Sequence, residues 1–561
     1  MDRNLFLAFA LSFGVLLIWT MLFDPPQPPP EENIPVQEEA ASAPPPLPSD
    51  PGSLPALAPV VPEEASPAKS PAPPLLGDPA DLDAGERIVV DTPLYRGELT
   101  TRGAGLVYWE LKDYRASKRE GGAPIVLTTG TGAFALALAT PFEELGLGDL
   151  SRVEFRVEEV GPLEYAFRFT RNGVTVRKIY TFFEDTYTYE LRIGVENGSD
   201  QEVSPRFAVG WPASEQPVND FREQALAAYA GGSLEIELIQ GLGVAGFFGG
   251  GVRERVLEGS VDWIGAQTAY FVAAILPDQP AQTGGRFVAT TPGVAGVSQA
   301  FFNPVRLPPG QRAERVVRGY IGPKEHKRLE QMGSGLVQSI DVGWSWIAPL
   351  TTFFAWLLEA LHVFIPNYGL AIIVLTILVR VVTTPLTMKQ MRSMERMRKL
   401  QPKLTELKEK YADDRQKQSE EMMRLYKNEG VNPLGGCLPM LLQLPVFIGL
   451  FYALRSSIQL RQAPFFGWID DLAAPDSLFM IPGVDIPFRV LPLIMGATML
   501  IQQRITPMQG MDPAQQKMMQ IMMPIVMTVV FYQFPSGLVL YWMVSNVLAI
   551  AHQLWVGKHM K

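Results

Sequence analysis

The stretch from Gly369 to Lys389 (GLAIIVLTILVRVVTTPLTMK) constrains the fold more than any other part of the chain. It can form a membrane-spanning helix, because the hydrocarbon core needs about 20 residues. Arg380 lies inside it, and eight residues separate it from the next charge, Lys389. An arginine at the centre of a spanning helix costs on the order of 3 kcal/mol and usually faces a protein interior or a water-filled cavity. The alternative is snorkelling, in which the side chain extends to the lipid headgroups.

The composition excludes several classes of function. The 561 residues carry a net charge of −10, which argues against bulk nucleic-acid binding, and the single cysteine, Cys437, cannot form an intrachain disulfide. The four histidines show no metal-ligand spacing, and no phosphate-binding loop, nucleophile elbow, zinc-protease motif or paired-cysteine motif is present. We therefore predict a protein that is not an enzyme, needs no cofactor and reads no nucleic-acid sequence.

The first 85 residues predict an anchor followed by a spacer. Residues 5–23 are uncharged and follow Arg3, and Asp24-Pro25-Pro26 comes next in place of a small-residue cleavage site. This pattern favours an uncleaved signal-anchor span over residues 1–23, with a cleaved signal peptide as the alternative. Residues 24–85 are rich in Pro, Ala, Glu and Ser and predict an extended linker.

Residues 86–325 have the texture of short alternating strands. In YELRIGV, Tyr189, Leu191 and Ile193 share one face. Asn172-Gly173 separates two alternating runs, which is a strong hairpin signal. We predict one large antiparallel β-sandwich without catalytic residues, and leave open a shallow ligand groove that the sequence does not reveal.

Residues 326–368 predict a linker and an amphipathic helix. The apolar run 337–364 carries Trp344, Trp346 and Trp356 together with a few polar residues. Tryptophan is enriched at bilayer interfaces, and such a helix can lie in the plane of the interface. We predict an interfacial helix, with a true span as the alternative.

The segment 389–431 is the most charged part of the chain. Within 389–429 there are twelve Lys or Arg and eight Asp or Glu residues. Leucines with helical spacing, Leu400 and Leu404 among them, precede a break at 412–414, and Met422, Leu425 and Tyr426 share a face beyond it. We predict a helical hairpin, and its basic excess indicates the cytoplasm.

Four more apolar segments follow within residues 432–561. They are residues 438–454, 488–503, 518–534 and 538–556, and several are shorter than the roughly 20 residues that a span needs. Short spans indicate local thinning of the bilayer or a polar cavity. With 5–23 and 369–388 they make six spans.

The charge of the loops predicts the orientation. The hairpin, the loop 504–517 and the C-terminal tail are basic, whereas the loop 455–487 carries four aspartates, Asp476 among them. Because basic loops stay in the cytoplasm, both termini are expected there, with the β-domain on the other side. If residues 337–364 were counted as a span, every later loop would lie on the side of the membrane opposite to the one that its charge predicts.

Isolated polar residues punctuate the spans. Thr376 and Arg380 are four residues apart and share a helix face. Gln443, Ser545 and Asn546 lie in other spans, and no span contains a carboxylate. A single polar residue in a span commonly just bonds a neighbouring helix. An arginine without a countercharge, however, favours a wet cavity that could receive an anionic group.

Methionines gather at two sites at the predicted cytoplasmic face. Met388, Met391, Met394 and Met397 recur every three residues, and six more lie between Met508 and Met523. Such residues often only fill a core. Flexible Met surfaces also suit many different apolar partners, which favours a receptor for hydrophobic peptide.

Four stretches carry a family resemblance. They are residues 432–465 (NPLGGCLPMLLQLPVFIGLFYALRSSIQLRQAPF), 534–546 (FPSGLVLYWMVSN), 320–324 (YIGPK) and 379–387 (VRVVTTPLT). With the anchor, linker and external β-domain, they make the chain resemble the YidC/Oxa1/Alb3 membrane protein insertases, in particular those of Gram-negative YidC type. The fold expected is a polytopic α-helical membrane protein with a five-helix core, a large external β-sandwich and a cytoplasmic helical hairpin.

The resemblance also implies a function. It implies an inner-membrane insertase and chaperone for newly made membrane proteins, acting alone or with the Sec translocon, with a large periplasmic domain. Ribosome, Sec translocon, nascent membrane proteins and lipid bilayer are the implied partners. The implied site is a cytoplasm-open hydrophilic groove around Arg380, with Thr376, Gln443, Ser545 and Asn546.

A hydrophobic slide is implied beside the groove. The slide residues map onto Leu444, Phe447, Val530 and Trp542. Trp542 stands where the family often has a second tyrosine, and Val530 where it can have an aromatic residue, so the slide stays apolar here.

Two other functions remain open from the residues. In a transporter or channel, Arg380 would be an anion site, although no internal repeat is evident. Alternatively, the β-domain could carry the function and the helices only anchor it.

Overall fold

The computed structural model describes the chain from residue 85 onward, with gaps. The described ranges are 85–116, 122–129, 136–216, 224–244, 253–411, 414–429, 438–483, 486–505 and 513–559. The predicted N-terminal span and almost all of the predicted linker lie outside these ranges.

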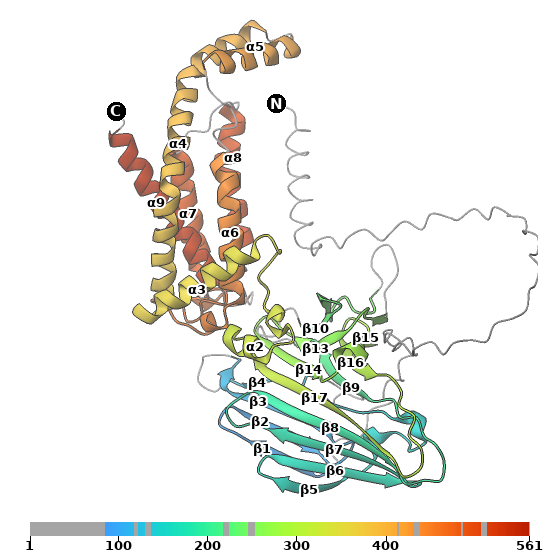
Figure 1. Cartoon of the computed structure of the whole chain (residues 1–561). Helices are drawn as coiled ribbons and strands as arrows, with labels where there is room; N and C mark the ends of the chain where they lie inside the picture. The colour runs from blue at the N-terminus through green and yellow to red at the C-terminus, as the bar shows by residue number, and fades with distance from the viewer. Residues whose placement is uncertain are drawn as a thin grey trace, which may run out of the picture. The chain divides into compact units, whose positions relative to one another are not determined.

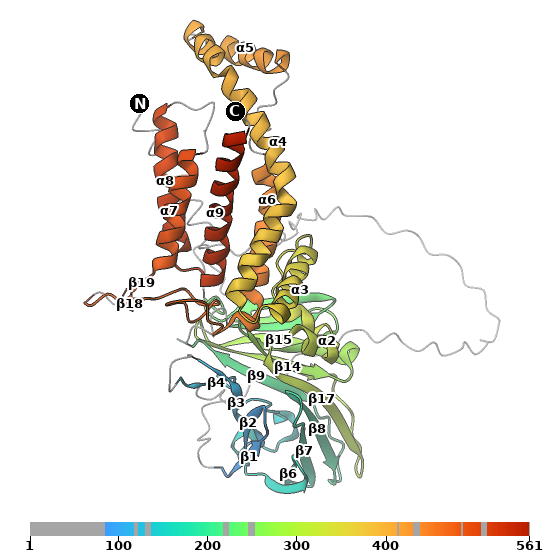
Figure 2. The same ribbon diagram turned by 90° about the vertical axis from the view of Figure 1, so that its left-hand side faces the viewer.

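The described residues of the β-domain form three antiparallel sheets (Figures 1 and 2). One four-stranded sheet has the order β1 (Arg87–Asp91), β2 (Tyr95–Thr100), β3 (Gly105–Arg115), β4 (Pro124–Val126). The nine-stranded sheet has the order β11 (Ser233–Leu238), β10 (Ala225–Ala230), β13 (Val261–Gln267), β14 (Phe271–Pro277), β17 (Arg312–Pro323), β8 (Thr188–Asn197), β7 (Val174–Phe182), β6 (Glu164–Arg171), β5 (Arg156–Gly161). The other four-stranded sheet has the order β12 (Glu254–Val256), β15 (Thr283–Thr291), β16 (Ala295–Phe302), β9 (Ala208–Ser214).

Both small sheets cover the same face of the large one. Residues directly opposite each other on paired strands share a face, and Phe182, Tyr189, Gly319, Ile275 and Ile264 are successive partners across five strands. Trp109 of β3 packs on Phe182, with 6.1 Å between ring centroids. The methyl end of Ile264 lies against Gly285 of β15. The predicted large antiparallel β-sandwich is confirmed.

The local sequence signals also hold in this domain. Asn172 and Gly173 have φ angles of 53° and 76°, and they connect β6 to β7 in a tight turn. Positive φ at both central residues is what a two-residue hairpin requires. Tyr189, Leu191 and Ile193 of β8 are buried.

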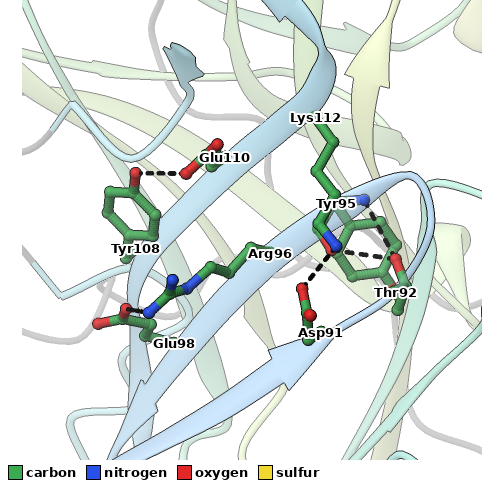
Figure 3. A network of polar contacts seen from close by, with 8 residues as sticks. All are labelled: Asp91, Thr92, Tyr95, Arg96, Glu98, Tyr108, Glu110 and Lys112. Carbon is green, nitrogen blue, oxygen red and sulfur yellow. Dashed lines mark hydrogen bonds and ion pairs between the residues drawn. The ribbon is translucent and has the colours of Figure 1, made fainter. Parts of the chain in front are cut away.

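The outer face of the first sheet carries paired charges (Figure 3). Lys112 pairs with Asp91 at 2.7 Å, and Arg96 pairs with Glu98 at 3.1 Å. These exposed pairs add little stability each. The inner face supplies the stability, because Tyr95 stacks on Trp109 with ring centroids 4.0 Å apart. Charges on the edge strand β1 also discourage pairing with another chain.

Lys178 of β7 points into the core of this domain. The side chain is fully buried, and its Nζ donates one hydrogen bond, of 2.8 Å, to the carbonyl oxygen of Leu138. Burial lowers the pKa of Lys178 to about 7, because the charged form loses its hydration. This buried amine is a weak point of the core, because it carries a charge with a single neutral hydrogen-bond partner.

The helical part follows the β-domain along the chain. Its helices are α2 (His326–Met332), α3 (Ala348–Phe364), α4 (Tyr368–Lys410), α5 (Arg415–Asn428), α6 (Leu438–Ser456), α7 (Val490–Ile505), α8 (Pro513–Phe531) and α9 (Ser536–His559). A small hairpin of β18 (Phe479–Met480) and β19 (Pro487–Phe488) lies between α6 and α7. In the described residues, the stretches Tyr368–Pro385 and Ser536–Val556 are long and apolar enough to cross a membrane.

One boundary differs from the predicted one, and one helix extends beyond its predicted span. The predicted span 369–388 lies within α4, which continues to Lys410. The residues between Lys389 and Lys410 are mostly strong helix formers without glycine, and Pro402 lies within the helix without ending it. The predicted interfacial helix 337–364 is α-helical only from Ala348, where Pro349 occupies the first turn, and its start is a short 3-10 helix, Leu336–Ser339.

The end of α4 packs on α5 as a helical hairpin. Leu400 and Leu404 are buried against Met422, Leu425 and Tyr426. Lys403 pairs with Glu429 at 2.7 Å across the hairpin.

Replacing Lys178 by methionine should stabilise the β-domain. Between about pH 7 and 10.5 the unfolded state binds a proton at Lys178 that the folded state does not, so wild-type stability rises with pH across this window. The gain in melting temperature for Lys178→Met should therefore be largest near pH 7 and shrink toward pH 10. Thermal unfolding of the full chain in detergent measures it. The exposed Arg177→Met is the matched control, and an equal gain from it would contradict this account.

Candidate functional site

Arg380 turns from α4 toward α9. Its Nη2 donates to the carbonyl oxygen of Ser545 at 2.9 Å and to the Ser545 hydroxyl at 2.8 Å. A helical carbonyl oxygen has a second lone pair, so Ser545 can accept this bond without losing its place in α9. Of the two alternatives left by the sequence, the contact to α9 favours a protein-facing arginine over snorkelling.

A tyrosine extends this contact to a third helix. The hydroxyl of Tyr541 lies within hydrogen-bonding reach of the side chains of Ser545 and Gln443. The network therefore joins α4, α9 and α6 through Arg380, Ser545, Tyr541 and Gln443. Three of these four residues were predicted as groove residues. Tyr541 was missed, although it lies four residues before Ser545 and so shares its helix face.

The other two predicted groove residues bond elsewhere. The Thr376 hydroxyl is buried and donates to the carbonyl oxygen of Ile372 at 2.6 Å, within its own helix. Asn546 donates to the hydroxyl of Thr498 on α7 at 3.4 Å. In this structure Asn546 thus joins α9 to α7, in keeping with the alternative of an interhelical hydrogen bond.

The guanidinium has neutral partners. Within the described residues, no carboxylate lies within ion-pair distance of Arg380. Both of its acceptors are neutral oxygens of Ser545. A charged donor bonded only to neutral acceptors can gain by exchanging them for a carboxylate.

Three of the four predicted slide residues, Phe447, Val530 and Trp542, pack on one apolar core. The rings of Phe447 and Trp542 meet edge to face at 4.7 Å, and Val530 packs on the same core. Leu444 is 50% exposed. Phe531 was missed by the sequence analysis, and its ring lies 5.0 Å from that of Trp542.

The outward faces of the helices are apolar. Val382 is 77% exposed, and Ile525 and Val529 of α8 are also exposed. Large exposed apolar faces suit a lipid surrounding. Most of the side chains in the two predicted methionine clusters lie outside the described residues.

α7 and α8 run side by side in both views (Figures 1 and 2). A Cβ on Gly496 would lie 2.1 Å from the Thr528 hydroxyl, so glycine is required for this close approach. Small residues at helix crossings are typical of membrane helices.

Two family models match the chain, one for each part. The model described as "60Kd inner membrane protein" matches residues 360–561, and the model described as "YidC periplasmic domain" matches residues 87–357. Apolar helices with an interior arginine, joined to a periplasmic β-sandwich, define an inner-membrane protein of the insertase class.

Relatives at full length make the assignment specific. The chain is 35% identical over 574 residues to the membrane protein insertase YidC of Syntrophus aciditrophicus (strain SB), covering 100% of both chains. It is 39% identical to that of Geobacter sp. (strain M21), covering 84% of this chain and 85% of the relative. The chain belongs to the YidC membrane protein insertase family. These relatives are named insertases and not enzymes, as predicted for this chain.

A solved structure is also similar. It is a crystal structure of an active YidC insertase with its first transmembrane domain resolved, at 17% identity and a TM-score of 0.36, covering 84% of this chain and 94% of that one.

Tyr541→Phe should loosen the three-helix network. The substitution keeps the ring and removes the hydroxyl that reaches Gln443 and Ser545, at a cost of roughly 1 kcal/mol. The melting temperature in detergent should fall by a few degrees. Tyr532→Phe is not a neutral control, because the Tyr532 hydroxyl donates to the carbonyl oxygen of Pro487. Tyr411→Phe, at the residue that follows α4, serves instead. An unchanged melting temperature for Tyr541→Phe would show that the hydroxyl contributes nothing.

Proposed function

We propose that this chain inserts newly made proteins into the inner membrane and helps them to fold, through a hydrophilic groove whose fixed charge is Arg380. The observation that carries this proposal is the pairing of Arg380 with neutral oxygens only. An incoming acidic side chain offers a bond in which both partners are charged, whereas Ser545 offers Arg380 only neutral acceptors. Its hydrophilic segment would rest near Arg380 before crossing.

The apolar cluster supports the second half of the reaction. Leu444 is exposed on α6, three residues before Phe447, whose ring meets that of Trp542. A client helix would pass this slide on its way into the lipid. Burial of the client's own apolar surface drives the step, and the membrane potential adds about 2.3 kcal/mol per charge per 100 mV.

The topology that we propose has six spans. The N and C termini and the α4–α5 hairpin lie in the cytoplasm, and the groove opens there. The ribosome and the Sec translocon would meet the chain at this face. α3 would lie in the opposite interface, supported by the exposure of Trp344, Trp346 and Trp356.

Arg380→Ala should weaken insertion of clients whose translocated tails are acidic, while Arg380→Lys should be tolerated. Alanine removes the only charge of the network, whereas lysine keeps it. The effect is measured in cells depleted of the native protein, by protease mapping of a client with two acidic residues in its tail. The same client with glutamines in place of the acidic residues is the comparison. The loss should be about tenfold for the acidic tail, as expected when one charge-assisted bond is removed.

Arg504→Ala is the matched control, because Arg504 is exposed at the end of α7 and its loss changes the net charge equally. Normal insertion of the acidic client by Arg380→Ala would refute the groove mechanism. An equal loss for both tails would show a folding defect in place of a charge effect.

A further inference from the structure

Asp476, counted in the sequence as one charge of an acidic loop, is buried. Only 4% of the residue is exposed. Its Oδ2 accepts three hydrogen bonds, from Trp468 Nε1 at 2.9 Å, from the Val490 amide at 2.9 Å and from the Leu491 amide at 3.0 Å. The last two are amides of the first turn of α7, which have no partner within the helix. Asp476 therefore caps α7 from another part of the chain.

The bond to Trp468 closes the intervening segment into a loop. Between these residues, Ile469 and Leu472 are buried in the same core as the helices. We call residues 464–476 the clamp segment.

The clamp segment also holds the start of α9. The Gly537 amide donates to the carbonyl oxygen of Leu472 at 2.9 Å. Ser536 donates to the carbonyl oxygen of Ala474 through its amide at 2.8 Å and its hydroxyl at 2.7 Å. The first turn of α9 is thus also bonded to the clamp, through backbone carbonyl oxygens in place of a carboxylate.

The third helix held by the clamp is α4. Asn367, which caps α4 through the Leu370 amide, donates to the carbonyl oxygen of Pro464 at 3.4 Å. Gly369 lies so close to the ring of Phe465 that a Cβ there would be 2.0 Å from it. The clamp fixes the first turns of α4, α7 and α9 against one another.

We propose that the clamp segment sets the axial register of α4 against α9, and that Asp476 is the positioning residue that locks it. A slip of one residue moves a helix by about 1.5 Å, enough to break the bonds of 2.8 and 2.9 Å between Arg380 and Ser545. Asp476 touches no client. Its effect on insertion rests on the groove function proposed above.

Asp476→Ala in the full chain tests this assignment. Hydrogen exchange in nanodiscs should become about tenfold faster at the amides of Val490 and Leu491 and also at Ser536 and Gly537, since the bonds to a charged acceptor are lost and the segment opens. Asp476→Asn keeps one acceptor oxygen and should give a smaller change. Asp470→Ala, an exposed aspartate of the same segment, should give none.

The same variants are tested for insertion of the two clients described above, one with acidic residues in its translocated tail and one with glutamines. Asp476→Ala should reduce insertion of the acidic tail severalfold and spare the glutamine tail. Unchanged exchange at Ser536 and Gly537 in both Asp476 variants would overturn the locking role. If Asp476→Ala reduced insertion of both tails equally, the proposed link between Asp476 and the register of α4 against α9 would be overturned.

The two proposals can fail separately. If Arg380→Ala does not distinguish the tails, the groove function fails, whereas the exchange rates still decide whether Asp476 locks the clamp. In another outcome, hydrogen exchange changes as expected and Arg380→Ala inserts the acidic tail less well than the glutamine tail. If Asp476→Ala then inserts both tails equally, only the positioning proposal fails.

Discussion

A permanently charged side chain inside an apolar helix must find polar partners on neighbouring helices. Arg380 finds them in the carbonyl and hydroxyl oxygens of Ser545, and this brings α4 against α9. Tyr541 and Gln443 then extend the polar contact to α6. The fold of the helical part thus follows from solvating one guanidinium without a carboxylate, since arginine does not lose its proton under physiological conditions.

Lys178 shows the contrasting solution in the β-domain. It is fully buried with one neutral acceptor, and burial lowers its pKa to about 7. A lysine can escape the cost of burial by releasing its proton, whereas an arginine cannot. Lys178 is therefore a buried cation that can become neutral in a static core, whereas Arg380 stays charged where clients are proposed to pass.

Features that depend only on neighbouring residues in the sequence could be predicted from it. A polar residue in an apolar helix is rare enough to be noticed, so Arg380, Gln443 and Ser545 were predicted together, and Asn172-Gly173 sufficed for its hairpin. Long-range partners left no such signal. The pairing of β8 with β17 and the burial of Asp476 both depend on segments distant in sequence. Tyr541 was missed because tyrosine is ordinary in membrane helices, and its role depends on Gln443 of another helix.

Neutral acceptors also set how tightly the groove can hold a client. The bonds from Arg380 to Ser545 already have a charged donor, so a client carboxylate that replaces Ser545 adds only the attraction of a second charge, less the cost of desolvating it, on the order of 1 kcal/mol for a pair that water reaches. That difference favours an acidic residue by about tenfold and is small enough for release. A resident carboxylate beside Arg380 would remove this preference, because the client would then displace a partner as strong as itself. An arginine held by a serine is therefore suited to a brief contact, and its usefulness depends on α4 and α9 staying in register.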